Sequence, residues 1–246
     1  MFHVEHKTVT TWADRHGMRI DEVCAGRLCR YAEMVSESGS KFNITGHETR
    51  DKILKDLVLG SLEPLAGLNV PRGTCFADIG TGAGVPGVPL GIVFPWMKGV
   101  LIDSSKRKTM FLKKVIRELG LGNLDVKCMR IEDAGRDKGM REGFGYVFAR
   151  ALGGVYLSLE LGAPLVSQSG MFFMFSRLVN GDLQEEVISH GLRLGMTAAE
   201  GGEGLPDCGN GGVFFRKYSS TPAEFPRRYS VIKRDSERIS RPGGAG

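Results

Sequence analysis

Apolar positions near the start of the chain recur at helical spacing. From Ile20 to about Gly39, apolar residues stand three or four positions apart among polar neighbours, which predicts an amphipathic helix. A second segment with this spacing runs from about Thr49 to Leu65. Between the two lies the turn-forming sequence KFNITGHE. We therefore expect residues 1–65 to form a helical appendage.

The pattern changes after about Gly73, where short apolar runs alternate with amphipathic stretches. The runs CFADIG, GVLID, LDVKCM, YVFAR and GMFFMFS read as strands, and stretches such as KTMFLKKVIREL read as helices. This alternation is typical of repeated βαβ units and a parallel sheet. Two more strand-like runs, near 192–198 and 213–218, predict an antiparallel ending. We expect an α/β fold with a mostly parallel, seven-stranded sheet in a core over residues 66–218.

The last segment, residues 219–246, is rich in Pro, Arg and Ser and ends in RPGGAG. We expect a basic C-terminal tail whose end is disordered, because such a sequence buries little apolar surface. The longest apolar stretch, Val85 to Trp96, contains three prolines and is too short to span a bilayer. The N-terminus lacks the apolar block of a signal peptide. These features predict a cytoplasmic protein without a membrane partner.

Composition and charge narrow the function further. With 41% hydrophobic and 25% charged residues, the chain can bury one main core. Its formal net charge of +5 favours a polyanionic partner such as a nucleic acid. The five cysteines form no C-x-x-C pair, and the five histidines are scattered along the chain. We therefore expect reduced thiols and no metal site.

The segment FADIGTGAGVPG is the clearest sign of a ligand site. An apolar strand runs into Asp78, and Gly80, Gly82 and Gly84 follow at alternate positions. Glycines permit a tight turn and a close approach of the backbone, and the next helix presents free N–H groups. The following predicted strand ends at Asp103, whose carboxylate can accept hydrogen bonds from ribose hydroxyls. This layout predicts a cofactor that contains adenosine.

Each of these features has a plain structural alternative. A glycine-rich loop can be an ordinary turn, and Asp103 can be the N-cap of the helix that follows. Two cofactors also compete, a nicotinamide dinucleotide and S-adenosylmethionine. The acid before the G-x-G-x-G loop, with Pro86 and Pro89 in the next helix, favours S-adenosylmethionine. No residues for hydride transfer stand out, which disfavours the dinucleotide.

At these residues the chain resembles the RsmG/GidB family of small-subunit (16S) ribosomal RNA guanine-N7 methyltransferases. The resemblance runs from about Leu28 through Arg234 and rests on FNIT, DIGTGAGVPGVPL, LIDSSKRKTMFL, RIEDA, FARA and RRYSVIKR. The second and third of these together are not a general methyltransferase feature. The resemblance implies a Rossmann-like S-adenosylmethionine-dependent methyltransferase fold, S-adenosyl-L-methionine as the cofactor, and the 16S rRNA of the small ribosomal subunit as the partner.

The resemblance also implies roles for single residues. Gly80 and Val85 would line the cofactor, and Ile131 and Glu132 would flank its adenine, although core packing is the plain alternative for Ile131. Arg150 ends an apolar strand and would close the site, because a buried guanidinium without a partner is costly. No catalytic residue is assigned. The expected cofactor-binding set is Gly80, Gly82, Gly84, Val85, Asp103, Ile131, Glu132 and Arg150.

Methyl transfer to guanine N7 needs an in-line approach and no loss of a proton from the base. Positioning and electrostatics therefore carry the rate, and no general base is expected. Basic clusters over residues 106–114 and 227–234 are candidates for phosphate contacts, with a solvated helix face as the alternative. Phe42 and Tyr229 are candidates to stack on a splayed base.

The chain departs from the family pattern in two places. Where the family usually carries R-H-x-L-D-S, this chain has DLVLGS, so Leu57 and Gly60 replace His and Asp. After the fifth strand, Ser176 and Arg177 replace the usual Lys and Gly. Both changes fall where substrate contacts are expected. A methyltransferase of a small molecule or protein, and a non-catalytic RNA-binding or ribosome-assembly factor, therefore stay open as alternatives. We expect a monomer.

Overall fold

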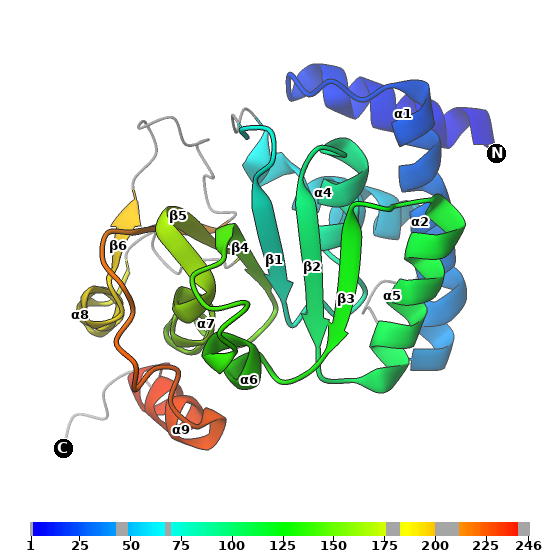
Figure 1. Cartoon of the computed structure of the whole chain (residues 1–246). Coiled ribbons are helices and arrows are strands. Elements are labelled where there is room, and N and C mark those ends of the chain that lie inside the picture. The colour runs from blue at the N-terminus through cyan, green and yellow to red at the C-terminus, as the bar shows by residue number, and fades with distance from the viewer. Residues whose placement is uncertain (1, 43–48, 67–69, 176–182, 200–211, 241–246) are drawn as a thin grey trace.

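The computed structural model describes residues 2–42, 49–66, 70–175, 183–199 and 212–240. Within these ranges lies a seven-stranded sheet with the strand order β3-β2-β1-β4-β5-β7-β6 (Figure 1). Strand β7 pairs antiparallel with both of its neighbours, and the other pairings are parallel. The predicted mostly parallel sheet is therefore confirmed. The strands are β1 (Cys75–Ile79), β2 (Lys98–Asp103), β3 (Leu124–Cys128), β4 (Phe144–Arg150), β5 (Val166–Phe175), β6 (Met196–Ala199) and β7 (Val213–Lys217).

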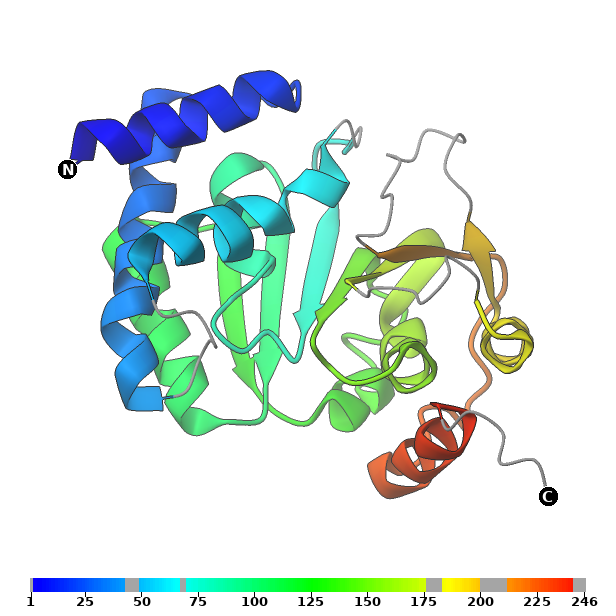
Figure 2. The same cartoon turned by 180° about the vertical axis from the view of Figure 1, so that it is seen from behind.

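Helices cover both faces of the sheet (Figures 1 and 2). Buried residues of α1, α2, α4 and α5 share one core with one face, and those of α6, α7, α8 and α9 share a second core with the other. The helices are α1 (Phe2–Arg15), α2 (Glu22–Phe42), α3 (Arg50–Lys52), α4 (Gly87–Val93), α5 (Lys106–Leu119), α6 (Ile131–Arg136), α7 (Val155–Gly162), α8 (Glu185–Arg193) and α9 (Tyr229–Ser240). In the described ranges, no helix combines the length and apolar character needed to cross a membrane.

The central strands alternate between these two cores. In β4, Phe148 packs into the core that contains α2 and α5, whereas Val147 and Ala149 face the core that contains α7. Successive residues of a strand point to opposite faces, and both faces are buried here. Strand β4 therefore reads as a continuous apolar run until it reaches Arg150.

The N-terminal appendage differs in detail from the expected pair of regular helices. Helix α1 begins at Phe2, ahead of the first helix expected from the pattern. The second predicted helix, 49–65, is wrong as a regular helix. The chain passes from α3 into the π-helix η1 (Ile53–Val58) and then the 3₁₀ turns η2 (Leu59–Ser61) and η3 (Glu63–Leu65). Its apolar positions are too closely spaced for one α-helical stripe, and the change of helix type buries them together.

The C-terminal segment also contains more structure than expected. Residues 229–240 form α9, which packs on α7, so the prediction of a plain tail over 219–246 needs correction. Ile232 is fully buried in this contact. The predicted disorder at the very end concerns residues 241–246, which lie outside the described residues. Helix α8 reaches Arg193, and the next strand begins at Met196 rather than near 192.

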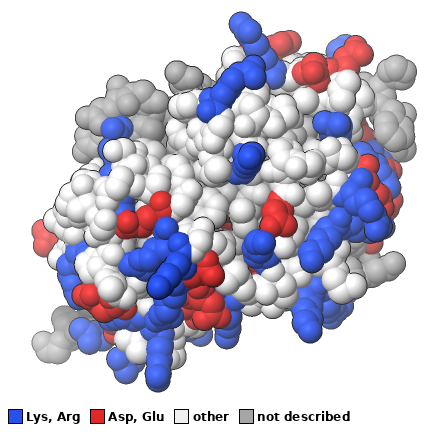
Figure 3. All heavy atoms as spheres, viewed as in Figure 1, with Lys and Arg blue, Asp and Glu red and all other residues white. Residues whose placement is uncertain are grey.

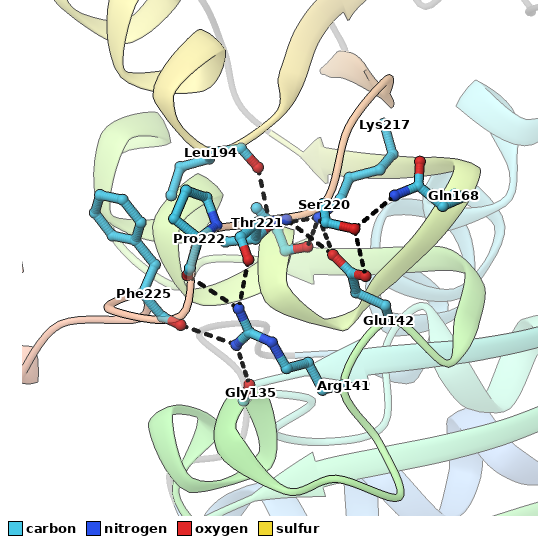
Figure 4. A network of polar contacts seen from close by, with 11 residues as sticks. Gly135, Arg141, Glu142, Gln168, Leu194, Lys217, Ser220, Thr221, Pro222 and Phe225 are labelled. Atoms are coloured by element: carbon cyan, nitrogen blue, oxygen red, sulfur yellow. Dashed lines mark hydrogen bonds and ion pairs between the residues drawn. The ribbon is translucent and has the colours of Figure 1, made fainter.

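A strap of residues 218–228 connects β7 to α9, and Figure 4 shows how it is held. The guanidinium of Arg141 donates hydrogen bonds to the carbonyl oxygens of Thr221 (2.7 Å) and Phe225 (2.9 Å). The carboxylate of Glu142 accepts a bond from the Thr221 amide at 2.8 Å. These contacts tie the strap to the loop before β4, and the strap in turn fixes where α9 begins.

A buried lysine reinforces the same network. Lys217, at the end of β7, donates to the carbonyl oxygen of Ala163 at 2.8 Å and lies 3.3 Å from the Glu142 carboxylate. It also donates to the hydroxyl of Thr221. Burial lowers the pKa of Lys217 to about 8, although Glu142 favours the charged form. The ammonium group thus has three polar partners at the root of the strap.

Candidate functional site

The glycine loop follows β1 and adopts a backbone that favours glycine. Gly80, Gly82 and Gly84 have φ angles of +64°, +59° and +102°, in the region that residues with a Cβ rarely enter. Space is limiting as well, because a Cβ on Gly80 would stand 2.6 Å from Cδ1 of Leu152. The backbone conformation of the loop therefore favours glycine at all three positions. At Gly80, the neighbouring Leu152 side chain also leaves no room for a Cβ.

Asp78 lies beneath this loop and holds its two ends. Its Oδ2 accepts hydrogen bonds from the Thr81 hydroxyl (2.6 Å) and from the Gly87 amide (2.9 Å) at the start of α4. Its Oδ1 is buried and has no hydrogen-bond partner among the described residues. Burial raises the pKa of Asp78 to about 7, against the opposing effects of the two bonds and of Arg150. Sequence analysis identified the acid but did not include it in the site.

Asp103 ends β2, beside the glycine loop. Its Oδ2 accepts a hydrogen bond from the Gly82 amide at 3.0 Å, and its Oδ1 accepts one from the Ser105 amide at 2.9 Å. The N-cap of α5 is Ser105, whose hydroxyl accepts from the Lys108 amide. The alternative of Asp103 as the N-cap is therefore wrong, because Ser105 already fills that place.

A cavity of about 260 Å³ opens at the carboxyl ends of β1, β2, β3 and β4. Among the predicted site residues it brings together Gly80, Asp103, Ile131 and Glu132. Ile131 also belongs to the buried core of α6 and α7, so it packs and lines the cavity at once. The full lining is Gly80, Asp103, Ser104, Lys108, Met129, Arg130, Ile131, Glu132, Ala151, Leu152, Leu161 and Tyr229.

Gly82, Gly84 and Val85 lie outside this lining. Gly84 faces the helices on the other side of the loop, since its Cβ would meet Leu112 at 2.7 Å and the hydroxyl of Tyr31 at 3.2 Å. That hydroxyl donates a hydrogen bond to the carbonyl oxygen of Ala83 at 2.8 Å. This part of the glycine loop therefore contacts the N-terminal appendage through α2.

Arg150 also lies outside the cavity lining, although it stands at the end of β4 as expected. Its guanidinium donates to the carbonyl oxygens of Leu57 (3.2 Å) and Asp56 (3.4 Å) in η1, and it stands 5.5 Å from the ring centre of Phe175. Burial lowers the pKa of Arg150. The side chain thus joins the sheet to the π-helix where the chain departs from the family pattern.

The other departures and candidates are placed only in part. Leu57 is buried in the core that the appendage shares with one face of the sheet, and Gly60 follows it in η2. Ser176, Arg177 and the side chain of Phe42 lie outside the described residues. The structure therefore gives a packing role to the residue that replaces the usual His.

Several residues of the cavity were not predicted from the sequence. Met129, Arg130, Ala151 and Leu152 directly follow β3 and β4, and their places after predicted strands were an unused signal. Ala151 has a φ of +54°, a conformation that is uncommon outside glycine and often occurs at functional sites. Tyr229 reaches the cavity from the first residue of α9, which no local pattern placed there.

Other parts of the described chain offer weaker candidates. A larger cavity, of about 540 Å³, lies among α7, α8 and α9, and none of its lining residues comes from a strand end. Among the residues that the structure describes, no group of three or more His, Cys, Asp or Glu side chains is placed to hold a metal. The cavity at the strand ends lies where doubly wound sheets usually bind ligands, outside the carboxyl ends of the strands.

Known proteins resemble this chain over most of its length. It is 33% identical to the ribosomal RNA small subunit methyltransferase G of Carboxydothermus hydrogenoformans, over 93% of this chain and 97% of that protein. It is 35% identical to the protein of that name from Desulfitobacterium hafniense, over 80% and 83%. A crystal structure of a mutant of MtNAS superimposes with a TM-score of 0.53 at 15% identity, covering 80% of this chain and 76% of that one, which supports the fold alone. Because the profile of the GidB family, described as rRNA small subunit methyltransferase G, also matches residues 25–187, the chain belongs to that family.

Proposed function

We propose that this protein transfers a methyl group from S-adenosyl-L-methionine to N7 of a guanine in the 16S rRNA of the small ribosomal subunit. The observation that carries the proposal is the cavity at the strand ends, where the glycine loop, the Asp103 carboxylate and the Ile131–Glu132 pair meet in a chain of this family. A cytoplasmic location and a monomeric state belong to the same proposal as further predictions.

The residues in the cavity fit an adenosine cofactor from end to end. Asp103 offers a fixed carboxylate to ribose hydroxyls, and its position at the end of β2 is the one such ligands use. Ile131 supplies an apolar wall for the adenine, beside Glu132. Gly80 lines the cavity through its backbone, with Leu152 packed beside it, and we assign this part to the methionine end. Gly82, Gly84 and Val85 act by shaping the loop rather than by lining the cavity.

Methyl transfer to N7 depends on the position of the base and on the charges around it. S-adenosylmethionine supplies an electrophilic methyl group on a positively charged sulfur. The N7 lone pair forms the new N–C bond, the electrons of the broken C–S bond stay on sulfur, and no proton leaves the base. The protein therefore has to align the base with the methyl group and stabilise positive charge as it moves onto the purine. We place Arg150 at the border of this region, where it holds β4 against η1.

Basic side chains near the cavity suit a polyanionic substrate. Lys108 and Arg130 line its mouth, and α5 carries further exposed cations. Figure 3 shows basic side chains over α5 along the right edge and over α9 at the lower left, with acidic side chains among them. Some of these cations have partners in the protein, such as Lys114 with Glu118 at 3.5 Å. Lys108 itself stands 3.7 Å from the Asp103 carboxylate, so phosphate contacts are proposed chiefly for Arg130, which is exposed.

The test is transfer of labelled methyl from S-adenosylmethionine to small ribosomal subunits from cells that lack this gene. The same preparation is tested on naked 16S rRNA and on total small molecules from those cells. We expect label in one guanine of the rRNA, as N7-methylguanine. Label only in a small molecule or a protein would overturn the rRNA assignment. Cofactor binding without any transfer would indicate a non-catalytic relative.

A further inference from the structure

A second cavity adjoins the first one at the carboxyl end of β4. Its volume is about 320 Å³. Leu152 and Tyr229 line both cavities, so the two spaces meet at these side chains. An occupant of the second cavity therefore lies next to the part of the first cavity that Leu152 and Tyr229 line. The second cavity is lined by Leu152, Gly153, Gly154, Leu157, Tyr229, Lys233, Ser236 and Glu237.

The walls of the second cavity suit a flat ring. Gly153 and Gly154 precede α7 and present backbone without side chains, and Gly153 has a φ of +105°. Leu152 and Leu157 supply apolar surface, and the half-buried Tyr229 adds an aromatic ring to the lining. Splayed bases of single-stranded RNA are commonly bound by stacking on such rings.

Its charged groups come from one helix and have opposite signs. Lys233 and Glu237 stand one turn apart on α9, with 3.7 Å between Nζ and Oε1, and both line the second cavity but not the first. The ammonium group only donates hydrogen bonds, and the carboxylate only accepts them. Guanine presents one acceptor, O6, beside the donors N1–H and N2–H₂. Adenine presents donors where guanine has O6 and an acceptor at N1, so it would mismatch both side chains.

We propose that the second cavity holds the guanine that receives the methyl group, an inference that rests on the proposed function. Glu237 accepts from N1–H and N2–H₂, Lys233 donates to O6, and the purine ring lies against Tyr229. N7 stands on the side of the purine opposite N1 and N2. A base held in this way turns N7 away from Glu237, and the proposal directs that edge toward Leu152, where the second cavity borders the first. The carboxylate also stabilises the positive charge that the base gains.

The test measures base recognition without methyl transfer. It uses a 16S-derived RNA that the wild-type protein methylates, with guanine, inosine or 7-deazaguanine at the target position. Binding is measured by fluorescence anisotropy in the presence of S-adenosylhomocysteine. The 7-deazaguanine RNA lacks N7 but keeps the edge that Glu237 contacts, so we expect it to bind as tightly as the guanine RNA. Inosine lacks the N2 amino group, and its RNA is expected to bind about 10-fold more weakly.

Three variants in α9 separate this account from a general loss of charge. Glu237→Ala should reduce the guanine-to-inosine affinity ratio to about 1, because the acceptor is gone. Lys233→Ala should weaken the binding of the guanine and inosine RNAs by the same factor, since both bases carry O6. Arg234→Ala removes a charge from the same helix but outside the cavity, and should keep the wild-type ratio. Affinity for S-adenosylhomocysteine should stay unchanged in all three variants.

An unchanged ratio in Glu237→Ala would overturn the inference while leaving the methyltransferase assignment in place. So would equal binding of the guanine and inosine RNAs by the wild-type protein. If the wild-type protein methylates no RNA in any form, the proposed function itself falls, and this inference falls with it.

Discussion

The carboxylate of Asp103 lies 3.0 Å from the amide nitrogen of Gly82 and accepts a hydrogen bond from it. This contact joins the end of β2 to the loop after β1. A second bond, from the Ser105 amide, fixes the other carboxylate oxygen. The carboxylate that we propose as the ribose acceptor is therefore oriented before a ligand binds, which lowers the entropic cost of ordering the site.

Replacement of Asp103 tests this preorganised acceptor. We expect Asp103→Ala to bind S-adenosylhomocysteine about 10- to 100-fold more weakly, because hydrogen bonds to a charged group are worth roughly 1.5–3 kcal/mol. Isothermal titration calorimetry measures the affinity. Asp133→Ala removes a carboxylate from the exposed side of α6, outside the cavity, and should bind as the wild type does. Equal affinities of the two variants would contradict the ribose role.

Gly80→Ala tests the shape of the loop. The new Cβ would meet Leu152 at 2.6 Å and would also force alanine into a φ of +64°. We expect loss of cofactor binding by calorimetry, together with a lower melting temperature. Gly73→Ala is the matched control, because its φ is +82° but nothing lies within 4 Å of its Cβ position. That variant should lose about 1 kcal/mol of stability and keep its affinity for the cofactor. Normal cofactor affinity in Gly80→Ala would refute the close packing described here.

Asp78 predicts a particular dependence of stability on pH. Its pKa is raised from 3.8 to about 7 in the folded state, so the folded protein binds more protons than the unfolded chain between these values. Stability from this group therefore falls as pH rises through that window, and it changes no further above about pH 7. We expect Asp78→Asn to gain stability relative to the wild type as pH rises from 5 to 8, by thermal unfolding. A difference that stays constant, or that shrinks, would count against the raised pKa.

Arg227 anchors α9, and its loss should disturb the cavity that Tyr229 lines. Its guanidinium contacts the buried Glu160 at 2.6 Å and Asp235 at 2.9 Å. Arg227→Ala is expected to lower the free energy of unfolding by about 3 kcal/mol, because Glu160 stays buried without this partner. Cofactor affinity should fall as well. The exposed neighbour Arg228 provides the control, and Arg228→Ala should change neither the free energy of unfolding nor the cofactor affinity.

The ion pair between Arg227 and Glu160 also predicts how the stability lost in Arg227→Ala varies with pH. Burial opposes the charged form of Glu160, yet the bonds from His190 and Arg227 lower its pKa from 4.5 to about 2. The stability that the carboxylate contributes is present above pH 4.5 and is lost as pH falls toward 2. Chemical denaturation should therefore show the deficit of Arg227→Ala shrinking over that range. A deficit independent of pH would mean that the carboxylate is not the partner that matters.

Much of the fold follows from local patterns in the sequence. The apolar runs around Asp78, before Asp103 and before Arg150 are strands, because both faces of the sheet are covered and most of their positions are buried. The π-helix η1 and helix α9 do not follow from such patterns. Each forms because of contacts with distant parts of the chain, such as Arg150 with Leu57 and Arg227 with Glu160.

The candidate site likewise contains residues that the sequence predicts and residues that it does not. Gly80 and Asp103 were predicted from their positions at the ends of strands, where the topology itself gathers side chains, whereas Ile131 and Glu132 came from the family resemblance. Tyr229 was predicted as a candidate to stack on a splayed base, but its place at the cavity was not predicted. Its place at the cavity depends on the strap, which Arg141 and Glu142 hold through contacts some 80 residues away in sequence. Local periodicity contains no signal for contacts of that separation.

The most direct test of the central claim is a map of N7-methylguanine in 16S rRNA from cells. RNA from a strain without this gene is compared with RNA from the same strain carrying the wild-type gene or Gly80→Ala, by reduction and aniline cleavage at the modified base. We expect one guanine to be cleaved only with the wild-type gene. Identical cleavage patterns in all three strains would contradict the assignment of this protein as an rRNA guanine-N7 methyltransferase.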